Sequence, residues 1–467
     1  MTPSNRLSPH KPDPIDLQSA IDAHHRQTLP RLQRLWNYYR NALPEPGQPH
    51  ARSPQSRALP QRLIQSPTPH ASAARELVIE NDIAWRVHSL VDFMFGKPVT
   101  IQSLAPEDPL AEQINDLLRA VFDHAGGPNF FQDLALLGSV YGYCDLVVHP
   151  HPDLPQLAIA PPPRAIPFHH PHDYRRLDAF AIHHGAPASA HPSITQRIAR
   201  ALSKQPAPTN DGPESTTLYS AQAIQRWTRT HGQPRRTTHQ EPNPLGRVPV
   251  VHIQNLPLPF SYAGLSDVEP LIPLQDELNT RLSDRANRVT FQSFKMYLGK
   301  GIDQFTERPV GPGQMWQTDN PDAAIEEFGG DAQSPSEDRH IQEIRDALDK
   351  TSAVPPLAAG ILRGRVGNLS SANAIRLVLL GLLAKTRKKR ITYGRGIAQA
   401  CELILHAADV SGILSTTPEQ RRVRLDWPEP IPASESESLD NALKKQQLGV
   451  PADRILAELG YADQGAA

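Results

Sequence analysis

The sequence predicts an α+β protein in which long helices alternate with β-rich segments. Apolar residues recur at helical spacing in three stretches, 266–297, 338–353 and 371–408. Short alternating runs separated by proline and glycine occupy 149–249 and 299–330, which is typical of strands joined by tight turns. With 467 residues, the chain is long enough for one large domain or for two to three linked domains.

Composition limits the ways in which this chain can contact nucleic acid. Its 48 prolines are about twice the usual share of roughly 5%, and only 39% of residues are hydrophobic. Part of the chain must therefore be exposed or irregular. The net charge is −1, whereas a protein that coats DNA is normally basic overall. Any nucleic-acid contact must be local, and a nearly neutral chain suits transient or sliding contact.

The cysteines and the apolar runs exclude several protein classes. Cys144 and Cys401 are the only cysteines, so neither a disulfide framework nor a thiolate metal site is expected, and both thiols are predicted to be buried. The N-terminus lacks the apolar stretch of a secretion signal. The longest apolar run, within 374–384, is shorter than the roughly 20 residues that span a bilayer. These features predict a soluble, intracellular protein.

The first half of the chain begins with an expected frayed segment, 1–28, followed by a short amphipathic helix. The apolar face of that helix comprises Leu32, Leu35, Trp36 and Tyr39. Residues 43–72 have the composition of a loop or arm. Further helices are expected over 81–95, 110–124 and 129–138, and strands over 99–101 and 140–148. Asn81 or Asp82 is predicted to cap the first of these helices.

The second half of the chain carries clearer helix signals. Ser266 to Glu269 has the capping-box pattern, and Pro355 ends the helix expected over 338–353. The stretch 371–408 predicts one helix of about 57 Å at 1.5 Å per residue. Gly394 and Gly396 are its expected kink. A β-like run is expected over 423–427, with terminal helices near 439–448 and 451–459.

Several segments have a family resemblance through their order and spacing. They are Leu35–Tyr39, Asn81–Val99 ending in Gly96-Lys97-Pro98-Val99, Gly138–Gly142, Pro270–Asn279 followed by Leu282-Ser283-Asp284, Val354–Pro356, Asn368–Ala374 and Trp427–Pro432. This set resembles the portal proteins of tailed double-stranded-DNA bacteriophages. The chain departs from the family pattern in the His/Pro-rich stretch 149–245, at Arg40 where the family has Gly, and at Ser371 where it often has Gly.

The resemblance implies a fold of several named parts. They are an N-terminal helix and flexible arm (1–72), an outer α/β wing (73–262, with the His/Pro-rich β insert 149–249), stem helix 1 (263–298), a small β-rich clip (299–335), stem helix 2 (336–354), a tunnel loop (355–371), a long kinked helix behind that loop (372–412) and a crown-like C-terminal segment (413–467).

The resemblance also implies a function without catalysis. Such a protein forms a ring, usually of twelve subunits, at one capsid vertex, and its channel passes double-stranded DNA during packaging and ejection without sequence preference. The implied partners are further copies of the chain, the terminase packaging motor, head-completion and connector proteins, and the major capsid and scaffolding proteins. The implied location is the virion, with assembly in the host cytoplasm and no membrane contact.

The candidate site residues are basic and lie in three groups. Arg363 and Arg365, with Asn368, are expected in the tunnel loop, where loose cationic side chains suit phosphate contact; a solvated surface loop is the alternative. The densest basic run comprises Lys385, Arg387, Lys388, Lys389 and Arg390. It is expected mainly to hold subunits together, with a solvated helix face and DNA contact as alternatives. For Arg281, Arg285 and Arg288, salt bridges within the helix or between subunits are favoured over DNA contact.

Two other functions remain open at this point. One is a metal-dependent hydrolase that uses His169, His170, His172, Asp173, His183 and His184. The prolines around the first group and the absence of an HExxH spacing argue against it. The other is a capsid-associated adaptor without a DNA channel. No phosphate-binding loop, GxSxG elbow or cofactor motif is present, so neither an enzyme nor a cofactor is predicted.

Overall fold

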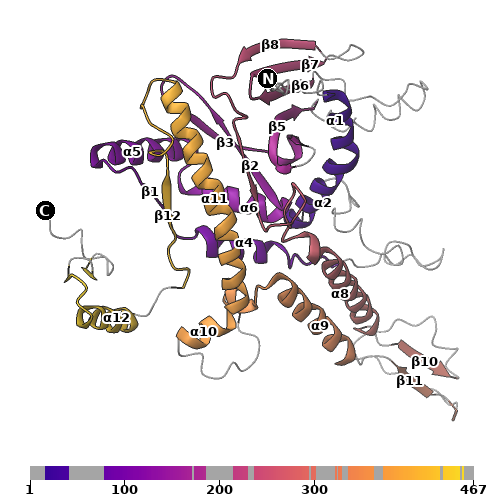
Figure 1. The fold of residues 1–467 in the computed structure, drawn as a ribbon. Helices are drawn as coiled ribbons and strands as arrows, with labels where there is room; N and C mark the ends of the chain where they lie inside the picture. Colours follow the sequence, from indigo (N-terminus) through magenta and orange to yellow (C-terminus); the bar gives the residue numbers. More distant parts are fainter. Residues whose placement is uncertain are drawn as a thin grey trace, which may run out of the picture. The chain divides into compact units, whose positions relative to one another are not determined.

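The computed structural model describes residues 16–41, 78–170, 173–185, 214–229, 236–293, 296–300, 321–322, 324–328, 335–361, 372–431, 435–452 and 455–456 (Figure 1). The chain forms two compact units. The first comprises residues 1–36, 85–269 and 353–467, and the second comprises 37–84 and 270–352. Helices and β-sheets both contribute, as the sequence predicts.

The helices are α1 (Leu17–Ala23), the π-helical turn η1 (His24–Thr28), α2 (Leu29–Arg40), α4 (Ala84–Phe95), α5 (Asp108–His124), α6 (Pro128–Tyr141), α8 (Ile272–Ser293), α9 (Pro335–Ser352), α10 (Ala372–Val378), α11 (Leu380–Val410) and α12 (Glu435–Gln447), with the 3₁₀ turns η2 (Pro162–Arg164), η3 (Glu269–Leu271) and η5 (Pro356–Ala359). The strands are β1 (Thr100–Ser103), β2 (Tyr143–His149), β3 (Gln156–Ala160), β4 (Ala165–His170), β5 (Asp173–His184), β6 (Glu214–Ser220), β7 (Ala223–Arg229), β8 (Arg236–Pro242), β9 (Val250–Gln254), β10 (Met296–Lys300), β11 (Ala324–Phe328) and β12 (Val423–Asp426).

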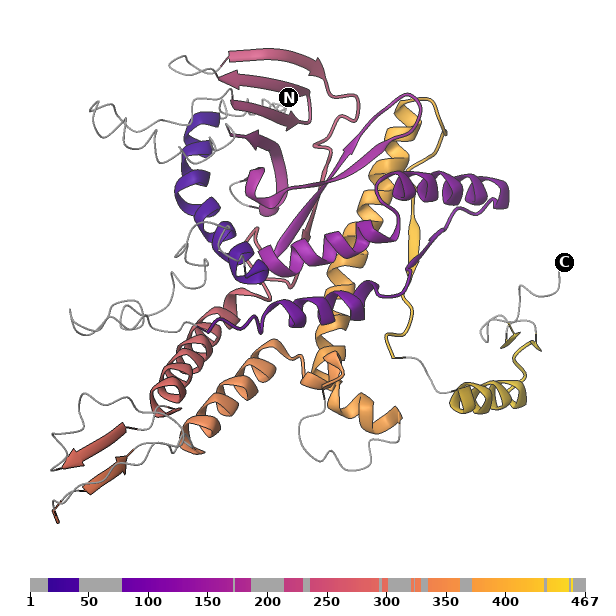
Figure 2. The same ribbon diagram turned by 180° about the vertical axis from the view of Figure 1, so that it is seen from behind.

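The core of the first unit is built around the antiparallel sheet β3-β2-β9. The central strand β2 is buried from Tyr143 to Val148, and Leu146 pairs with Ile159 on one side and Val251 on the other. Helices α6 and α11 pack against this sheet (Figure 2). A second antiparallel sheet, β4-β5-β6-β7-β8, confirms the β-rich segment predicted before residue 249.

The N-terminal segment differs from the expectation. Residues 17–28 are helical rather than frayed, because Leu17 and Ile21 have apolar partners in the second sheet. Both side chains are buried against Ile166, Ala179 and Leu218. Asp16 caps the helix by accepting a hydrogen bond from the amide of Ser19 (3.1 Å).

Two predicted boundaries near the first sheet are also corrected. Val140 and Tyr141 belong to α6 and not to a strand, since Gly142 ends that helix in the left-handed conformation (φ 92°). The predicted cap Asn81 is confirmed, because its Oδ1 accepts from the amide of Ala84 at 3.1 Å. The β-like run near the C-terminus is confirmed as β12, which pairs antiparallel with β1.

The long helix is interrupted at a different place from the predicted kink. It breaks at Leu379, between α10 and α11, and α11 continues through Gly394 and Gly396. Gly396 instead allows close packing: a Cβ there would lie 2.3 Å from Cγ1 of Ile253 on β9. Helix α11 therefore needs a glycine at this position to approach the sheet.

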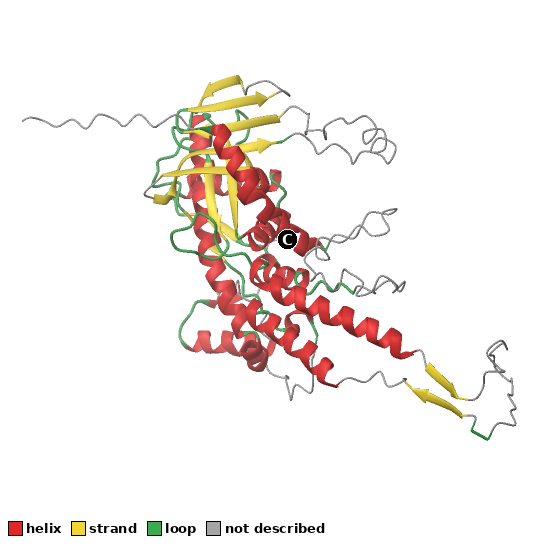
Figure 3. Cartoon of the chain, turned by 90° about the vertical axis from the view of Figure 1, so that its right-hand side faces the viewer, coloured by secondary structure: helices red, strands yellow, loops and turns green. Residues whose placement is uncertain are grey.

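The second unit contains two helices and a short β-hairpin-like pair (Figure 3). Helices α8 and α9 pack against each other, and β10 pairs antiparallel with β11. This agrees with the predicted helices and with the predicted β unit between them, although residues 301–320 lie outside the described residues. Ile341, Ile344 and Leu348 form the buried stripe of α9, as the sequence predicts.

A row of three polar side chains on α8 holds the extended segment 78–82. The side chains of Ser283, Asn279 and Gln275 accept from the amides of Val78 (3.0 Å), Glu80 (3.0 Å) and Asp82 (3.1 Å) respectively. Four helical residues rise about 6.0 Å, close to the roughly 6.6 Å of two extended residues. The i, i+4 spacing on α8 therefore matches every second residue of the extended segment.

Candidate functional site

The predicted DNA-facing residues Arg363, Arg365 and Asn368 lie outside the described residues. The structure describes the two ends of their loop. On one side, η5 ends at Gly360, which has a left-handed φ of 75°. On the other side, the chain resumes at Ala372, the first residue of α10.

The basic run on α11 enters a buried cluster, which we call the polar hub. Its members are Ser139, Asn255, Asp267, Lys385, Lys389 and Tyr393. Nζ of Lys389 lies 2.5 Å from Oδ2 of Asp267 and donates to Oγ of Ser139 at 2.8 Å. Nζ of Lys385 lies 2.8 Å from Oδ1 of Asp267. One carboxylate therefore holds two lysines that stand four residues apart on one helix.

Asn255 and Tyr393 complete the polar hub. The amide Nδ2 of Asn255 donates to Oδ2 of Asp267 at 2.9 Å, and the Tyr393 hydroxyl donates to Oδ1 of Asn255 at 3.0 Å. Gly138 makes room for that tyrosine, since a Cβ there would lie 1.9 Å from its hydroxyl. The polar hub thus joins four parts of the chain: α6, the end of β9, helix α11, and the segment that precedes α8.

The charges in the polar hub depend on one another. Burial would raise the pKa of Asp267, but Lys389 and Lys385 outweigh burial and hold that pKa well below its usual range. Burial lowers the pKa of Lys389 to about 8, and Asp267 offsets part of this effect. Because the lysine side chain is completely buried, removal of its partner would leave an uncompensated charge in the core.

The polar hub lies just before α8 in the chain. Ser266, next to Asp267, accepts from the amides of Val268 (3.0 Å) and Glu269 (3.2 Å), as the predicted cap requires. The Glu269 carboxylate does not complete the capping box but binds Arg31 of α2, with Oε2 2.5 Å from Nη2. These contacts fix the residues that lead into η3.

Among the other basic residues of this run, Arg390 makes contacts within the chain, and Arg387 and Lys388 face solvent. Arg390 donates to the carbonyl oxygens of Phe93 and Pro428, and its guanidinium lies 5.2 Å from the Trp427 ring. Arg387 and Lys388 are exposed. The expectation of an inter-subunit or channel role is therefore corrected for Lys389, whose charge is enclosed within its own chain. Arg387 and Lys388 remain candidates for contact with another molecule.

The three arginines of α8 form ion pairs within the second unit. Arg281 contacts Glu277 (2.7 Å) and Asp284 (3.3 Å) on its own helix. Arg285 and Arg288 instead reach Asp338 and Glu337 of α9. The favoured intrahelical salt bridges are found for Arg281, whereas Arg285 and Arg288 pair with the neighbouring helix α9 of the same chain.

The histidines do not assemble a metal centre in the part of the chain that the structure describes. No group of three or more His, Cys, Asp or Glu side chains there could hold an ion. His183 and His184, neighbours on β5, have different environments. The first is buried, with Nδ1 2.9 Å from Oγ1 of Thr216, and the second lies 3.3 Å from Arg164. His172 lies outside the described residues.

Sequence reasoning missed two features of this site. In the sequence, Asp267 lies within the capping pattern from Ser266 to Glu269. Nothing in that local pattern marks it as the partner of Lys389, which is 122 residues away. The row on α8 left a signal, since Gln275, Asn279 and Ser283 stand at exact helical spacing within the segment that resembles the portal family. Residues four apart lie on the same face of a helix, so this spacing predicts that the three uncharged polar side chains share one face.

The chain is similar to chains in solved structures, among them two from gene transfer agent particles. A chain in the neck of an empty gene transfer agent particle is 15% identical, with 81% of this chain and 90% of that chain covered and a TM-score of 0.49. A chain in the virion of a native gene transfer agent particle is 14% identical, with 82% and 87% covered and a TM-score of 0.42. No curated protein sequence matches the chain significantly.

Among the described residues, no helix is both long and apolar enough to cross a membrane. The family model described as phage portal protein, SPP1 Gp6-like, matches residues 18–461, from α1 to beyond α12. This match includes the polar hub, the side chains of Gln275, Asn279 and Ser283 on α8, and the residues Gly360 and Ala372 on either side of the predicted DNA-facing arginines. The chain therefore belongs to the SPP1 Gp6-like family of phage portal proteins.

Proposed function

We propose that twelve copies of this chain close into a ring at one capsid vertex. The channel of this ring would conduct double-stranded DNA into and out of the particle. The observation that carries this proposal is the family match over residues 18–461. The portal family is structural, and the proposed role needs no catalysis by this chain. The particle is the proposed final location, with assembly in the host cytoplasm.

The second unit supports the assignment of stem and clip. Helices α8 and α9 are joined by Arg285–Asp338 and Arg288–Glu337, and Arg345 of α9 lies 2.6 Å from Glu80 in the segment held by α8. Several charge pairs distributed along two helices favour a stiff arm. We assign residues 299–335, which include β11 and the end of β10, to the clip, where the terminase motor and later the connector proteins would dock. Major capsid and scaffolding proteins would contact the wing.

Residues 355–371 are the proposed tunnel loop. The structure describes the first part of this segment, in which η5 ends at the αL residue Gly360, and helix α10, which begins directly after the segment at Ala372. Arg363, Arg365 and Asn368 would contact phosphates there without reading sequence, as side chains that position DNA do. Because the net charge of the chain is −1, DNA contact would be confined to a few residues such as these.

The ring is tested by negative-stain imaging of the purified chain, which should show particles with a central hole. A persistent monomer at high concentration would refute the ring. The tunnel loop is tested by deletion of residues 360–368 and by the double variant Arg363→Ala with Arg365→Ala. Both should form rings, and both should reduce DNA packaging. The matched control is Arg339→Ala, because Arg339 is an exposed arginine on α9. Normal packaging by the deletion variant would refute the tunnel-loop assignment.

A further inference from the structure

The loop between β9 and η3 presents an apolar tip to solvent. Phe260 is 92% exposed, and Leu258 is also exposed. Phe260 adopts a left-handed φ of 62°, which is rare for a bulky residue and persists only where the surrounding structure enforces it. We call residues 257–260, Pro-Leu-Pro-Phe, the apolar tip.

The loop is braced directly behind the apolar tip. Nε2 of Gln254 donates to the carbonyl oxygens of Ser261 (2.7 Å) and Tyr262 (3.1 Å). The Tyr262 hydroxyl donates to Oδ1 of the buried Asp145 at 2.6 Å. The amide of Leu265 donates to the carbonyl of Leu256 at 2.9 Å and closes the loop. The backbone next to the exposed phenyl ring is therefore held in place before any partner arrives, which lowers the entropy cost of binding.

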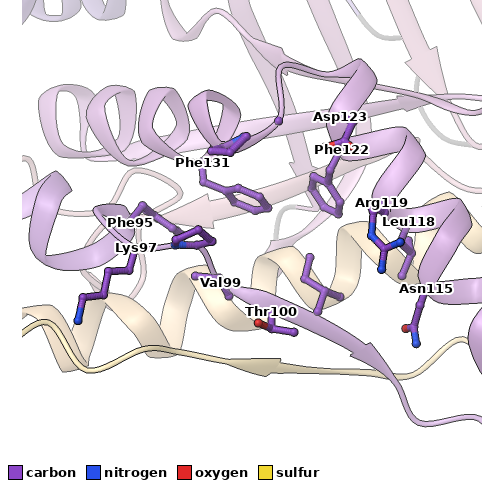
Figure 4. Close-up of a pocket in the computed structure, with 14 residues that line it drawn as sticks. Phe95, Lys97, Val99, Thr100, Asn115, Leu118, Arg119, Phe122, Asp123 and Phe131 are labelled. Carbon is purple, nitrogen blue, oxygen red and sulfur yellow. The ribbon is translucent and has the colours of Figure 1, made fainter. Parts of the chain in front are cut away.

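The same unit contains an aromatic pocket (Figure 4). It has a volume of about 270 Å³, and all of its lining residues fall between Phe95 and Phe131. Phe122 and Phe131 stack with centroids 5.0 Å apart, and Phe95 lies 5.5 Å from Phe131. A cavity of roughly 150 Å³ lined by such side chains holds benzene. This pocket therefore has room for one phenyl ring and part of a neighbouring side chain.

Two of the polar side chains that line the pocket are already engaged within the chain. Lys97 donates to the carbonyl oxygen of Glu429 at 3.0 Å, and Arg119 donates to Asp116 at 3.1 Å. The apolar lining is therefore the part that recognises a partner, and aromatic rings pair favourably beyond the area that they bury. The exposed phenyl ring matches this pocket in size and in apolar character.

From these observations we infer that the apolar tip of one copy inserts Phe260 into the aromatic pocket of the next copy around the ring. Each copy carries one tip and one pocket on the same unit. A contact between two unlike surfaces is heterologous, and such contacts generate closed rings when the rotation closes. This inference rests on the proposed ring assembly and names a contact that would hold it together.

Cysteine cross-linking tests the contact directly. The full chain would carry Leu258→Cys in the apolar tip, which leaves Phe260 in place, together with Arg119→Cys at the pocket rim, and be treated with a short bismaleimide. The background should be low, because Cys144 and Cys401 are both completely buried. The double variant should give covalent species beyond the dimer. Each single variant should stay monomeric on a denaturing gel, and a mixture of the two single variants should give dimers only.

Substitution at the tip gives a second measurement. Phe260→Ala should raise the concentration needed for assembly by at least about tenfold, as loss of a central aromatic contact does. Phe260→Trp should retain assembly. The control is Leu265→Ala, an exposed apolar residue of the same loop outside the tip, which should assemble normally.

The outcomes separate this contact from the proposed function. If the unmodified chain forms rings while the double variant does not cross-link beyond the dimer and Phe260→Ala assembles normally, the contact is refuted and the ring stands. If Leu258→Cys alone gives efficient dimers, the tips meet each other and the proposed pairing is wrong. If the unmodified chain never assembles, both the ring and this contact are refuted.

Discussion

Nζ of Lys389 lies 2.5 Å from Oδ2 of Asp267 at a site where both side chains are almost entirely shielded from solvent. Asp267 stands just before η3 and α8, and Lys389 stands near the middle of α11. Lys385 contacts the other carboxylate oxygen. The segment that leads into α8 is thus tied to the long helix by one carboxylate shared between two cations.

Replacement of the shared carboxylate should cost more stability than replacement of one lysine. Asp267→Asn strands two cations and should lower the free energy of unfolding by about 3–5 kcal/mol, because removal of one partner leaves buried charge uncompensated. Lys389→Met should cost less, since Lys385 still pairs with Asp267. Urea denaturation measures both, with the exposed Arg387→Met expected within about 0.5 kcal/mol of the unmodified chain. Equal stability of Asp267→Asn and the unmodified chain would contradict the structure.

The same carboxylate should contribute to acid sensitivity. Its pKa in the folded chain is held below the unfolded value of roughly 3.9 by Lys389 and Lys385, against the effect of burial. A lowered folded pKa means that the unfolded chain binds the proton more readily, so this contribution is present above that value and is lost as pH falls. The stability difference between the unmodified chain and Asp267→Asn should be largest above pH ~5 and shrink below pH ~4. A difference that stays constant across this range would exclude the assigned ionisation.

Two glycines two residues apart on α11 should respond in opposite directions to alanine. Gly396→Ala places a Cβ 2.3 Å from Cγ1 of the buried Ile253, and overpacking of this kind costs roughly 1–3 kcal/mol. Gly394→Ala meets nothing closer than 3.5 Å, at Trp427, and should stabilise the helix by up to about 1 kcal/mol. Thermal unfolding compares the two variants. Addition of Ile253→Ala should relieve part of the Gly396→Ala penalty if the clash is its cause.

The row on α8 should protect three particular amides from hydrogen exchange. Ser283→Ala removes the acceptor of the Val78 amide, and Asn279→Ala removes that of the Glu80 amide. Each variant should speed exchange most at its own partner and should cost about 1–3 kcal/mol where a buried group is left unpaired. Gln342→Ala on the exposed face of α9 is the control. Uniform acceleration along the segment would indicate general loosening instead of loss of single bonds.

The sequence by itself determined the local elements with strong signals. The apolar stripe of Ile341, Ile344 and Leu348 predicted α9, and Asn81 correctly predicted a cap, because helical spacing and capping depend on residues close together in the chain. The ordered motifs from Leu35 to Pro432 also indicated the family. Where a signal was local but ambiguous, as with Gly394 and Gly396, the structure places the helix interruption at Leu379 instead, since helix-breaking glycines and close-packed glycines look alike in sequence.

Only the tertiary structure decided what the polar and charged groups do. Lys389 lies in a run that a sequence assigns to a surface, yet it is buried because Asp267, 122 residues away, neutralises it there. Residues 17–28 are helical because β4, β5 and β6 supply apolar partners for Leu17 and Ile21. Local spacing identifies neither Asp267 as the partner of Lys389 nor the strands that cover Leu17 and Ile21. Burial and charge pairing depend on distances in space, which are set only when the chain has folded.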